Sequence, residues 1–143
     1  MNLDLIRKWE GCKLEAYICP AGIVTIGYGN TYDLNGNKIK MGQKITQKEA
    51  EELLNTLVND YIKCVKNNVT SVINDNQMSA LVSFVWNVGC ANFKNSTLLK
   101  LINKNPNDPT IRLEFNKWNK VNKVAVKGLT NRRKDEADTY FLK

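Results

Sequence analysis

The chain contains no histidine, and its four cysteines, Cys12, Cys19, Cys64 and Cys90, form no closely spaced pair. Structural zinc sites use close cysteine pairs that histidine often completes, so the sequence gives no support to a zinc site. We expect neither a metal nor another cofactor. A chain of 143 residues can bury a sizeable core without covalent crosslinks, so we expect four reduced thiols.

Long apolar runs are also missing. No stretch approaches the roughly 18 consecutive apolar residues that span a bilayer. The segment from Met1 to Trp9 mixes acidic, basic and apolar residues and lacks the basic and then apolar pattern of a secretory signal. We therefore expect no signal peptide, no stable membrane insertion, and a chain that stays in the cytoplasm until another factor releases it.

Arginine is scarce, because 17 of the 21 basic residues are lysine and four are arginine. Proteins that read nucleic acid use the bidentate arginine fork heavily, and the lysines here alternate with asparagine and acidic residues. The net charge of +7 favours polyanionic partners such as nucleic acid, an acidic membrane surface or a bacterial wall. We expect no nucleic-acid partner, and a basic nucleic-acid-binding or membrane-active protein is the weaker alternative.

The hydrophobic pattern predicts strands only near the N-terminus. Residues 3–10 have the spacing of a short amphipathic helix, with Gly11 at its C-cap position. Residues 14–18 and 23–28 alternate and are rich in β-forming residues. The turn residues 19–22 between them complete a predicted hairpin. A third short strand is expected at residues 38–40.

Everything after residue 45 is expected to be helical. The capping box of Thr46 and Glu49 begins a long helix that reaches about residue 66. A helix over residues 75–88 is apolar around most of its circumference and is expected to be buried. Later helices are expected at residues 98–102, from an N-cap at Asp108 with Pro109 in the first turn as far as Trp118, and from an N-cap at Thr130 onward.

This distribution predicts an α+β fold in one bilobed domain, residues 1–143. Residues 1–45 would form a small lobe with a helix and an antiparallel hairpin. Residues 46–66 would form a connecting helix, and residues 67–143 a larger, all-helical lobe. A cleft between the lobes would bind an extended ligand, and we expect the chain to be a monomer.

Three residues at the start of the chain carry the functional hypothesis. Glu10 is in the last turn of the first helix, where a partly desolvated carboxyl group can keep a proton for a departing sugar oxygen. Cys19 follows after eight intervening residues, and Thr25 after five more. They belong to two segments, Glu10-Gly-Cys-Lys-Leu-Glu-Ala-Tyr17 and Thr25-Ile-Gly-Tyr-Gly-Asn-Thr31.

This spacing resembles the signature of the phage-type lysozymes, the endolysins of glycoside hydrolase family 24. The likeness continues through residues 80–89, 93–99 and 128–136, so it covers nearly the whole chain. It implies a lysozyme-like fold and hydrolysis of the β-1,4 bond between N-acetylmuramic acid and N-acetylglucosamine in peptidoglycan. The partner would be the glycan strand of the wall, and the outcome would be lysis of the host cell. Whether a holin releases the enzyme stays open.

The resemblance also assigns roles to single residues. It makes Glu10 the general acid that protonates the leaving sugar oxygen, a role that glycosidic cleavage requires. It places Gly29, Thr31 and Phe93 at the substrate, and Arg132 near the acid. A position in the hydrophobic core is the alternative for Phe93.

Cys19 leaves the mechanism open. Most relatives have aspartate at this position, which positions a water molecule together with the threonine. A free thiol has a pKa of about 8.5, so a thiolate at neutral pH needs a shift, which Lys13 could supply. A neutral thiol could instead help Thr25 to orient water, or Cys19 could only pack the turn. A weak or inactive wall-binding relative and a lytic transglycosylase therefore stay as alternatives.

Overall fold

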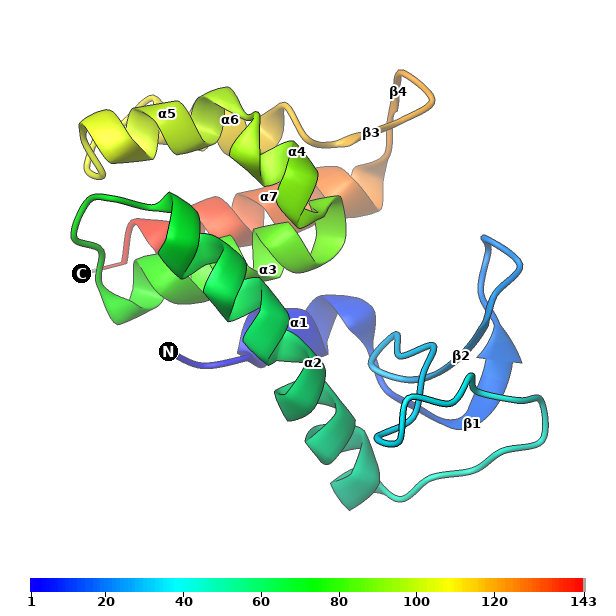
Figure 1. The fold of residues 1–143 in the computed structure, drawn as a ribbon. Coiled ribbons are helices and arrows are strands. Elements are labelled where there is room, and N and C mark those ends of the chain that lie inside the picture. Colours follow the sequence, from blue (N-terminus) through cyan, green and yellow to red (C-terminus); the bar gives the residue numbers. More distant parts are fainter. Residues whose placement is uncertain (143) are drawn as a thin grey trace. The chain divides into compact units, whose positions relative to one another are not determined.

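The computed structural model describes residues 1–142 (Figure 1). The elements follow in the order α1 (Asp4–Glu10), β1 (Lys13–Ile18), β2 (Val24–Gly27), α2 (Gln47–Asn68), α3 (Asp75–Val88), α4 (Cys90–Lys94), α5 (Thr97–Lys104), α6 (Ile111–Asn116), β3 (Lys120–Val121), β4 (Val124–Ala125) and α7 (Lys127–Tyr140). Helices dominate, and there are two small antiparallel sheets, which confirms the α+β class. Within the described residues, no helix is both long and apolar enough to cross a membrane.

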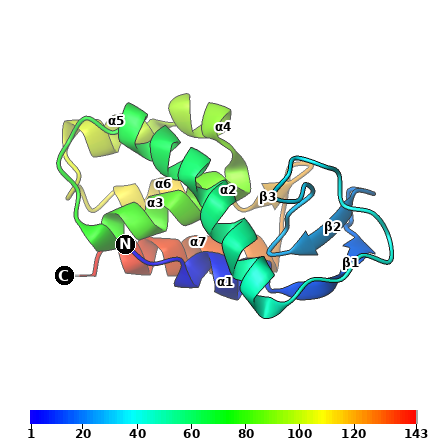
Figure 2. The ribbon, with the colours of Figure 1, turned by 60° about the horizontal axis from the view of Figure 1, so that its bottom comes forward.

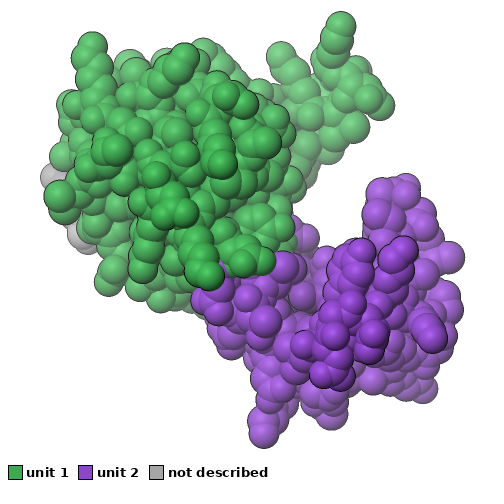
Figure 3. All heavy atoms as spheres, viewed as in Figure 1, with its two compact units in different colours: residues 1–5, 60–143 green, residues 6–59 purple. Residues whose placement is uncertain are grey.

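The chain separates into two compact units, which Figure 3 shows in different colours. Unit 2 comprises Ile6–Asn59, and unit 1 comprises Met1–Leu5 together with the described residues from Asp60 onward. The boundary falls inside α2, because α2 continues to Asn68. The expected division into lobes at residues 45 and 66 stays a prediction.

The predicted hairpin is confirmed in unit 2. β1 and β2 pair antiparallel, with Tyr17 opposite Thr25. The turn between them closes where the Cys19 N–H donates to the Ile23 carbonyl at 3.0 Å and the Gly22 N–H donates to the Cys19 carbonyl at 2.8 Å. Figure 2 shows the two strands side by side. The turn residues between two β-rich runs were therefore sufficient to predict this hairpin from the sequence.

The expected third strand at residues 38–40 was wrong. Within residues 1–142, Lys38 makes only an isolated bridge with Tyr32. The Asp33 carboxylate accepts the N–H groups of Asn35 and Asn37, both at 2.9 Å, and this local turn replaces a continued ladder. The neighbouring Ile39 is buried. Ile39 belongs to an apolar cluster of unit 2 with Ala16, Ile26 and Leu53, against which Val24 and Ile45 pack.

The predicted C-cap of α1 and the predicted capping box at the start of α2 are confirmed. Gly11 has φ +65° and its N–H donates to the Arg7 carbonyl at 3.1 Å, which ends α1. At the start of α2, the Glu49 N–H donates to the Thr46 hydroxyl at 3.1 Å, and the Thr46 N–H donates to the Glu49 carboxylate at 3.2 Å. These reciprocal bonds satisfy donors that the first helical turn leaves unpaired.

Unit 1 is built around α3, which lies beside α7 in both ribbon views (Figures 1 and 2). Phe84 of α3 is fully buried. Its ring meets the edges of three other rings at centroid distances of 6.2 Å to Phe93, 5.5 Å to Phe115 and 5.8 Å to Trp118. Edge-to-face contacts at these distances add to the free energy gained from burial.

The predicted first residues of α6 and α7 were wrong. α6 begins at Ile111 and ends before Trp118. Asp108 accepts the N–H and the hydroxyl of Thr110, at 2.9 and 2.6 Å, so it closes a turn before the helix and does not cap it. α7 begins at Lys127, three positions before the expected cap at Thr130, whose hydroxyl donates back to the Val126 carbonyl at 3.2 Å.

The hairpin of β3 and β4 was not expected, so the prediction of a purely helical region after residue 67 was wrong. Val121 pairs with Val124 across the turn residues Asn122 and Lys123. Both turn residues have positive φ, 50° and 68°. This conformation matches the twist of a two-residue hairpin, and asparagine tolerates it better than most residues.

A disulfide joins Cys64 of α2 to Cys90 of α4, with 6.1 Å between their Cα atoms. Cys12 and Cys19 are free thiols. The expectation of four reduced thiols was therefore wrong for two of them. The two bonded cysteines are separated by 26 positions, and the fold of unit 1 brings them together.

We predict that the denatured, unreduced protein exposes two reactive thiols to a thiol-specific dye and that reduction raises the number to four. Replacing Cys64 and Cys90 with alanine should lower the free energy of unfolding by about 3 kcal/mol, because the bond restricts the unfolded chain. Urea unfolding measures that loss. Four reactive thiols before reduction would contradict the bond.

Candidate active site in unit 2

Glu10 is the last residue of α1 and is half-buried. The buried Ile6, one turn earlier, anchors this helix in the interior of the protein. The backbone of Gly29 lies directly beside the carboxylate, since a Cβ built on Gly29 would be 3.6 Å from Glu10 Oε2. Gly29 has φ +95°, a conformation that L-residues rarely adopt, so glycine is required here.

Cys19 and Thr25 are brought together by the hairpin turn. Cys19 is half-buried, and Thr25 is 4% exposed. The Thr25 hydroxyl donates to the Ile23 carbonyl at 2.9 Å, the same carbonyl that accepts the Cys19 N–H. The Ile23 carbonyl therefore holds both the Cys19 backbone and the Thr25 side chain.

Hydrogen bonds hold the pKa of the Cys19 thiol below its ordinary value. The largest contribution to the lowered pKa comes from the backbone of Ile23. Burial, the second-largest effect, raises the pKa, and the Thr25 hydroxyl and the backbone of Ala21 each lower it by less. A hydroxyl has a single proton to donate, so the Thr25 hydroxyl can turn from the Ile23 carbonyl to the thiolate. The charge of Lys13, which the sequence suggested as the cause, does not contribute to the pKa shift.

Tyr17 also belongs to this group, although sequence reasoning gave it no role. Its pKa is raised, first by partial burial and then by the negative charges of Cys19 and Glu10. Both charges therefore lie near the Tyr17 hydroxyl. The strand pattern gave no usable signal, because Cys19 lies in the turn beyond β1 and Glu10 belongs to α1.

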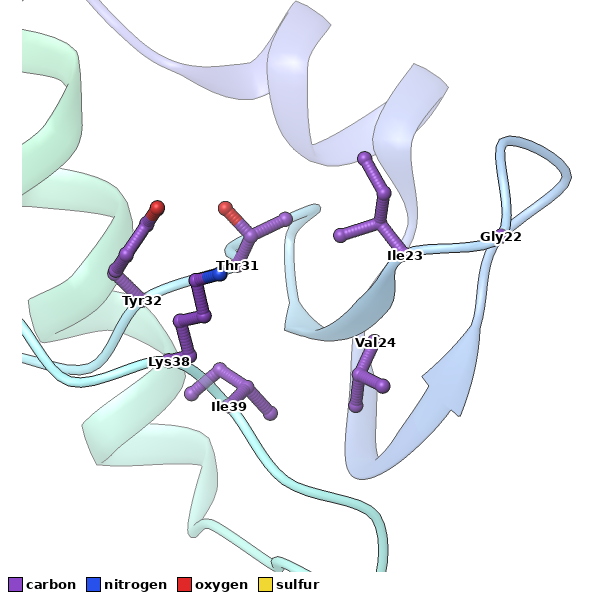
Figure 4. A pocket seen from close by; sticks show the side chains of 7 residues that line it. All are labelled: Gly22, Ile23, Val24, Thr31, Tyr32, Lys38 and Ile39. Carbon is purple, nitrogen blue, oxygen red and sulfur yellow. The ribbon is translucent and has the colours of Figure 1, made fainter.

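A surface pocket of about 410 Å³ lies beside the hairpin in unit 2. Its lining residues are Gly22, Ile23, Val24, Thr31, Tyr32, Lys38 and Ile39. Figure 4 shows the loop residues Thr31, Tyr32 and Lys38 on one side and Ile23 and Val24 of the hairpin on the other. Hydroxyl groups and an ammonium group thus stand opposite aliphatic surface, a combination that suits a ligand with both polar and apolar faces.

The two remaining predicted residues lie in unit 1. Phe93 has no exposed surface and packs against Phe84, so its ring has the core position that was the alternative. Arg132 is 4% exposed, forms an ion pair with Glu136 at 3.3 Å and donates to the Ser83 carbonyl at 3.1 Å. The expected pair of Arg132 with Glu10 joins residues of different units and stays a prediction.

A metal site has no support in the described part of the chain. Among residues 1–142, no three histidine, cysteine, aspartate or glutamate side chains are placed to hold an ion. The side chains described at this site offer one carboxyl group, one thiol of lowered pKa and hydroxyl groups.

Comparison with known proteins gives consistent matches. The family described as phage lysozyme matches residues 7–136. An endolysin of Acyrthosiphon pisum secondary endosymbiont phage 1 is 36% identical over 94% of this chain and 91% of its own length. An endolysin of Bacillus phage PZA is 35% identical over 94% of this chain, which spans 51% of that longer protein.

The fold has close counterparts among solved structures. The endolysin from Escherichia coli O157:H7 phage FAHEc1 superposes with a TM-score of 0.91 and 38% sequence identity. The alignment covers 99% of this chain and 94% of the other.

We predict that Cys19 is alkylated faster than an ordinary thiol near neutral pH, because its lowered pKa increases the thiolate fraction. Replacing Thr25 with valine removes one of the stabilising hydrogen bonds and should move the alkylation profile of Cys19 to higher pH. Peptide mass spectrometry after iodoacetamide treatment over a pH series measures this shift. Cys12 is the internal control, and an unmoved Cys19 profile would contradict the role of Thr25.

Proposed function

Because the chain belongs to the phage lysozyme family and is thus a peptidoglycan hydrolase, we propose that it cleaves the β-1,4 bond between N-acetylmuramic acid and N-acetylglucosamine. One observation carries this proposal. The half-buried carboxyl group of Glu10 stands beside the Gly29 backbone, in the same unit as the paired Cys19 and Thr25. A carboxyl group and a second group that handles water are the two parts that glycoside hydrolysis needs.

Glu10 is the proposed general acid. It donates its proton to the oxygen of the departing sugar as the bond to the anomeric carbon breaks, and the ring carbon develops positive charge. Its half-buried position at the end of α1 beside the Gly29 backbone supports this role, because the surrounding protein restricts the movement of the carboxyl group. Gly29 further supports the role of Glu10, because glycine places no side chain beside the carboxylate.

Cys19 and Thr25 are the proposed water-handling pair. The Cys19 thiolate accepts a proton from water while the oxygen of that water attacks the anomeric carbon, and the Thr25 hydroxyl holds the water. Attack on the face opposite the leaving group inverts the configuration. The lowered pKa of Cys19 supports a thiolate in this role, since it makes the base available closer to neutral pH.

Gly29 and Thr31 are the proposed glycan contacts in unit 2. Thr31 lines the pocket beside the hairpin, and the aliphatic wall of that pocket reaches Ile23, which holds Cys19 and Thr25. Phe93 and Arg132 are buried in unit 1, which supports them as core residues more than as glycan contacts. The proposal does not depend on either of them.

In the proposed biological role, the enzyme lyses the host cell from within after a holin or another route releases it. The net charge of +7 supports adsorption to an anionic wall. Adsorption of this kind weakens with rising salt, since counterions screen exposed charges.

We predict that Glu10→Gln lowers the rate at which permeabilised cells lose turbidity by about 100-fold or more, the typical worth of a general acid. Glu15→Gln is a matched control, because Glu15 is an exposed glutamate on β1. It should leave the rate unchanged. Full activity of Glu10→Gln would overturn the acid assignment, and a wild type that does not clear cells would favour the inactive wall-binding relative.

Substitutions of Cys19 separate chemistry from packing. Cys19→Asp should retain activity, because a carboxylate can also accept the proton from water. Cys19→Ser keeps a similar volume but loses the base, so it should lower the turbidity rate. Equal rates for wild type and Cys19→Ser would show that the thiol does no chemistry.

The products distinguish hydrolysis from transglycosylation. Hydrolysis adds one water to each cleaved bond, whereas a transglycosylase leaves an anhydro-muramic end that lacks this water. Mass spectrometry of digested wall fragments should show the hydrated ends only. Anhydro ends as the main product would refute the proposed reaction.

A further inference from the structure

The carboxylate of Glu51 connects three segments of unit 2. Arg7 of α1 donates to it through Nε, at 3.3 Å to each oxygen, and through Nη2 at 2.9 Å. The Tyr28 hydroxyl, which follows β2, donates to Glu51 Oε1 at 2.8 Å. Gln47, one turn earlier on α2, donates to the Tyr28 hydroxyl at 3.1 Å and to Glu51 Oε1 at 3.4 Å.

The two segments that Glu51 holds are those that meet at Glu10. Arg7 is one turn before Glu10 on α1, and its carbonyl accepts the Gly11 N–H that ends the helix. Tyr28 is bonded directly to Gly29, whose backbone lies beside Glu10 Oε2. A shift of α1 against the segment after β2 would therefore change the surroundings of the Glu10 carboxyl group.

The contacts favour a fixed geometry. The side chains of Arg7 and Glu51 are 36% and 32% exposed, so water screens their ion pair only in part. Tyr28 is 5% exposed, so its hydroxyl depends on partners within the protein. Charge-assisted hydrogen bonds of this type are stronger and more directional than neutral ones.

From this geometry we infer that Glu51 is a positioning residue, which holds α1 and the Tyr28–Gly29 backbone in the relation that the acid at Glu10 requires. The inference rests on the proposed function of Glu10. Glu51 itself touches no reacting atom. Its main effect is on kcat, because a misplaced acid slows proton transfer, whereas of the two proposed glycan contacts only Gly29 would move and Thr31 of the pocket would stay in place.

The charge state of Glu51 agrees with this role. Its pKa is lowered, first by the hydrogen bonds from Arg7 and then by that from Tyr28. The titratable groups that face the network are Arg7 on α1, Tyr28 after β2, and Cys12, which acts on Tyr28. A lowered carboxyl pKa means that the bonds persist above it and are lost as the pH falls through it.

The test compares two adjacent glutamates on α2. Glu51→Gln keeps the shape of the side chain but removes the charge that binds Arg7, so kcat on soluble wall fragments should fall about tenfold or more while KM changes less than about twofold. Glu52→Gln is the matched control, because Glu52 is exposed. It should leave kcat and KM unchanged, and thermal unfolding of both variants shows whether each is folded at the assay temperature.

Two further measurements separate positioning from stability. The ratio of wild-type to Glu51→Gln kcat should shrink toward acidic pH, since protonated Glu51 resembles glutamine. Tyr28→Phe removes only a hydroxyl and should also lower kcat, and its effect should not add fully to that of Glu51→Gln because both break one network. Tyr28→Phe therefore tests the inference even where Glu51→Gln unfolds.

The outcomes distinguish this inference from the proposed function. An active wild type, an inactive Glu10→Gln and a Glu51→Gln variant with unchanged kcat would overturn only the positioning role. A loss confined to KM, or a lower melting temperature with unchanged kcat, would overturn it as well. An active Glu10→Gln would instead remove the proposed acid itself.

Discussion

The close approach of the Gly29 backbone to the Glu10 carboxylate is the constraint on which the candidate site depends. It requires a glycine at φ +95°, a helix that ends at Gly11, and a hairpin that returns the chain to the end of that helix. A side chain at position 29 would be strained by this φ, and its Cβ would lie in van der Waals contact with the carboxylate at 3.6 Å. The short sheet of unit 2 thus serves mainly to present loops: one carries Cys19, and the other brings Gly29 to the acid.

Local signals in the sequence were sufficient for most of the architecture. The hairpin, the Gly11 cap, the Thr46–Glu49 capping box and the buried α3 each rest on residues that are neighbours in the chain, and all four are present in the structure. Helix starts were less predictable. Asp108 and Thr130 are good N-cap residues by type, but their side chains form other local hydrogen bonds.

What the sequence could not supply depends on contacts between distant residues. The Cys64–Cys90 bond joins residues 26 positions apart. The charges that act on Tyr17 come from a helix end and a turn that the fold brings together. Two partners of Glu51, Tyr28 and Arg7, are 23 and 44 positions away, so no periodic pattern in the sequence predicts these contacts. The β3–β4 hairpin was not predicted for a different reason. Lysine and asparagine around a few valines are as typical of a loop as of a short hairpin.

The cysteines of this chain respond to oxidants in opposite ways. Cys64 and Cys90 form their bond by giving two electrons and two protons to an external oxidant, so an oxidising compartment favours the bonded form of unit 1. Cys19 is an accessible thiol with a lowered pKa, which is the type that peroxide converts first to sulfenic acid. An aspartate in its place would be immune to this damage. The oxidants that complete the Cys64–Cys90 bond in unit 1 would therefore also modify Cys19 in unit 2.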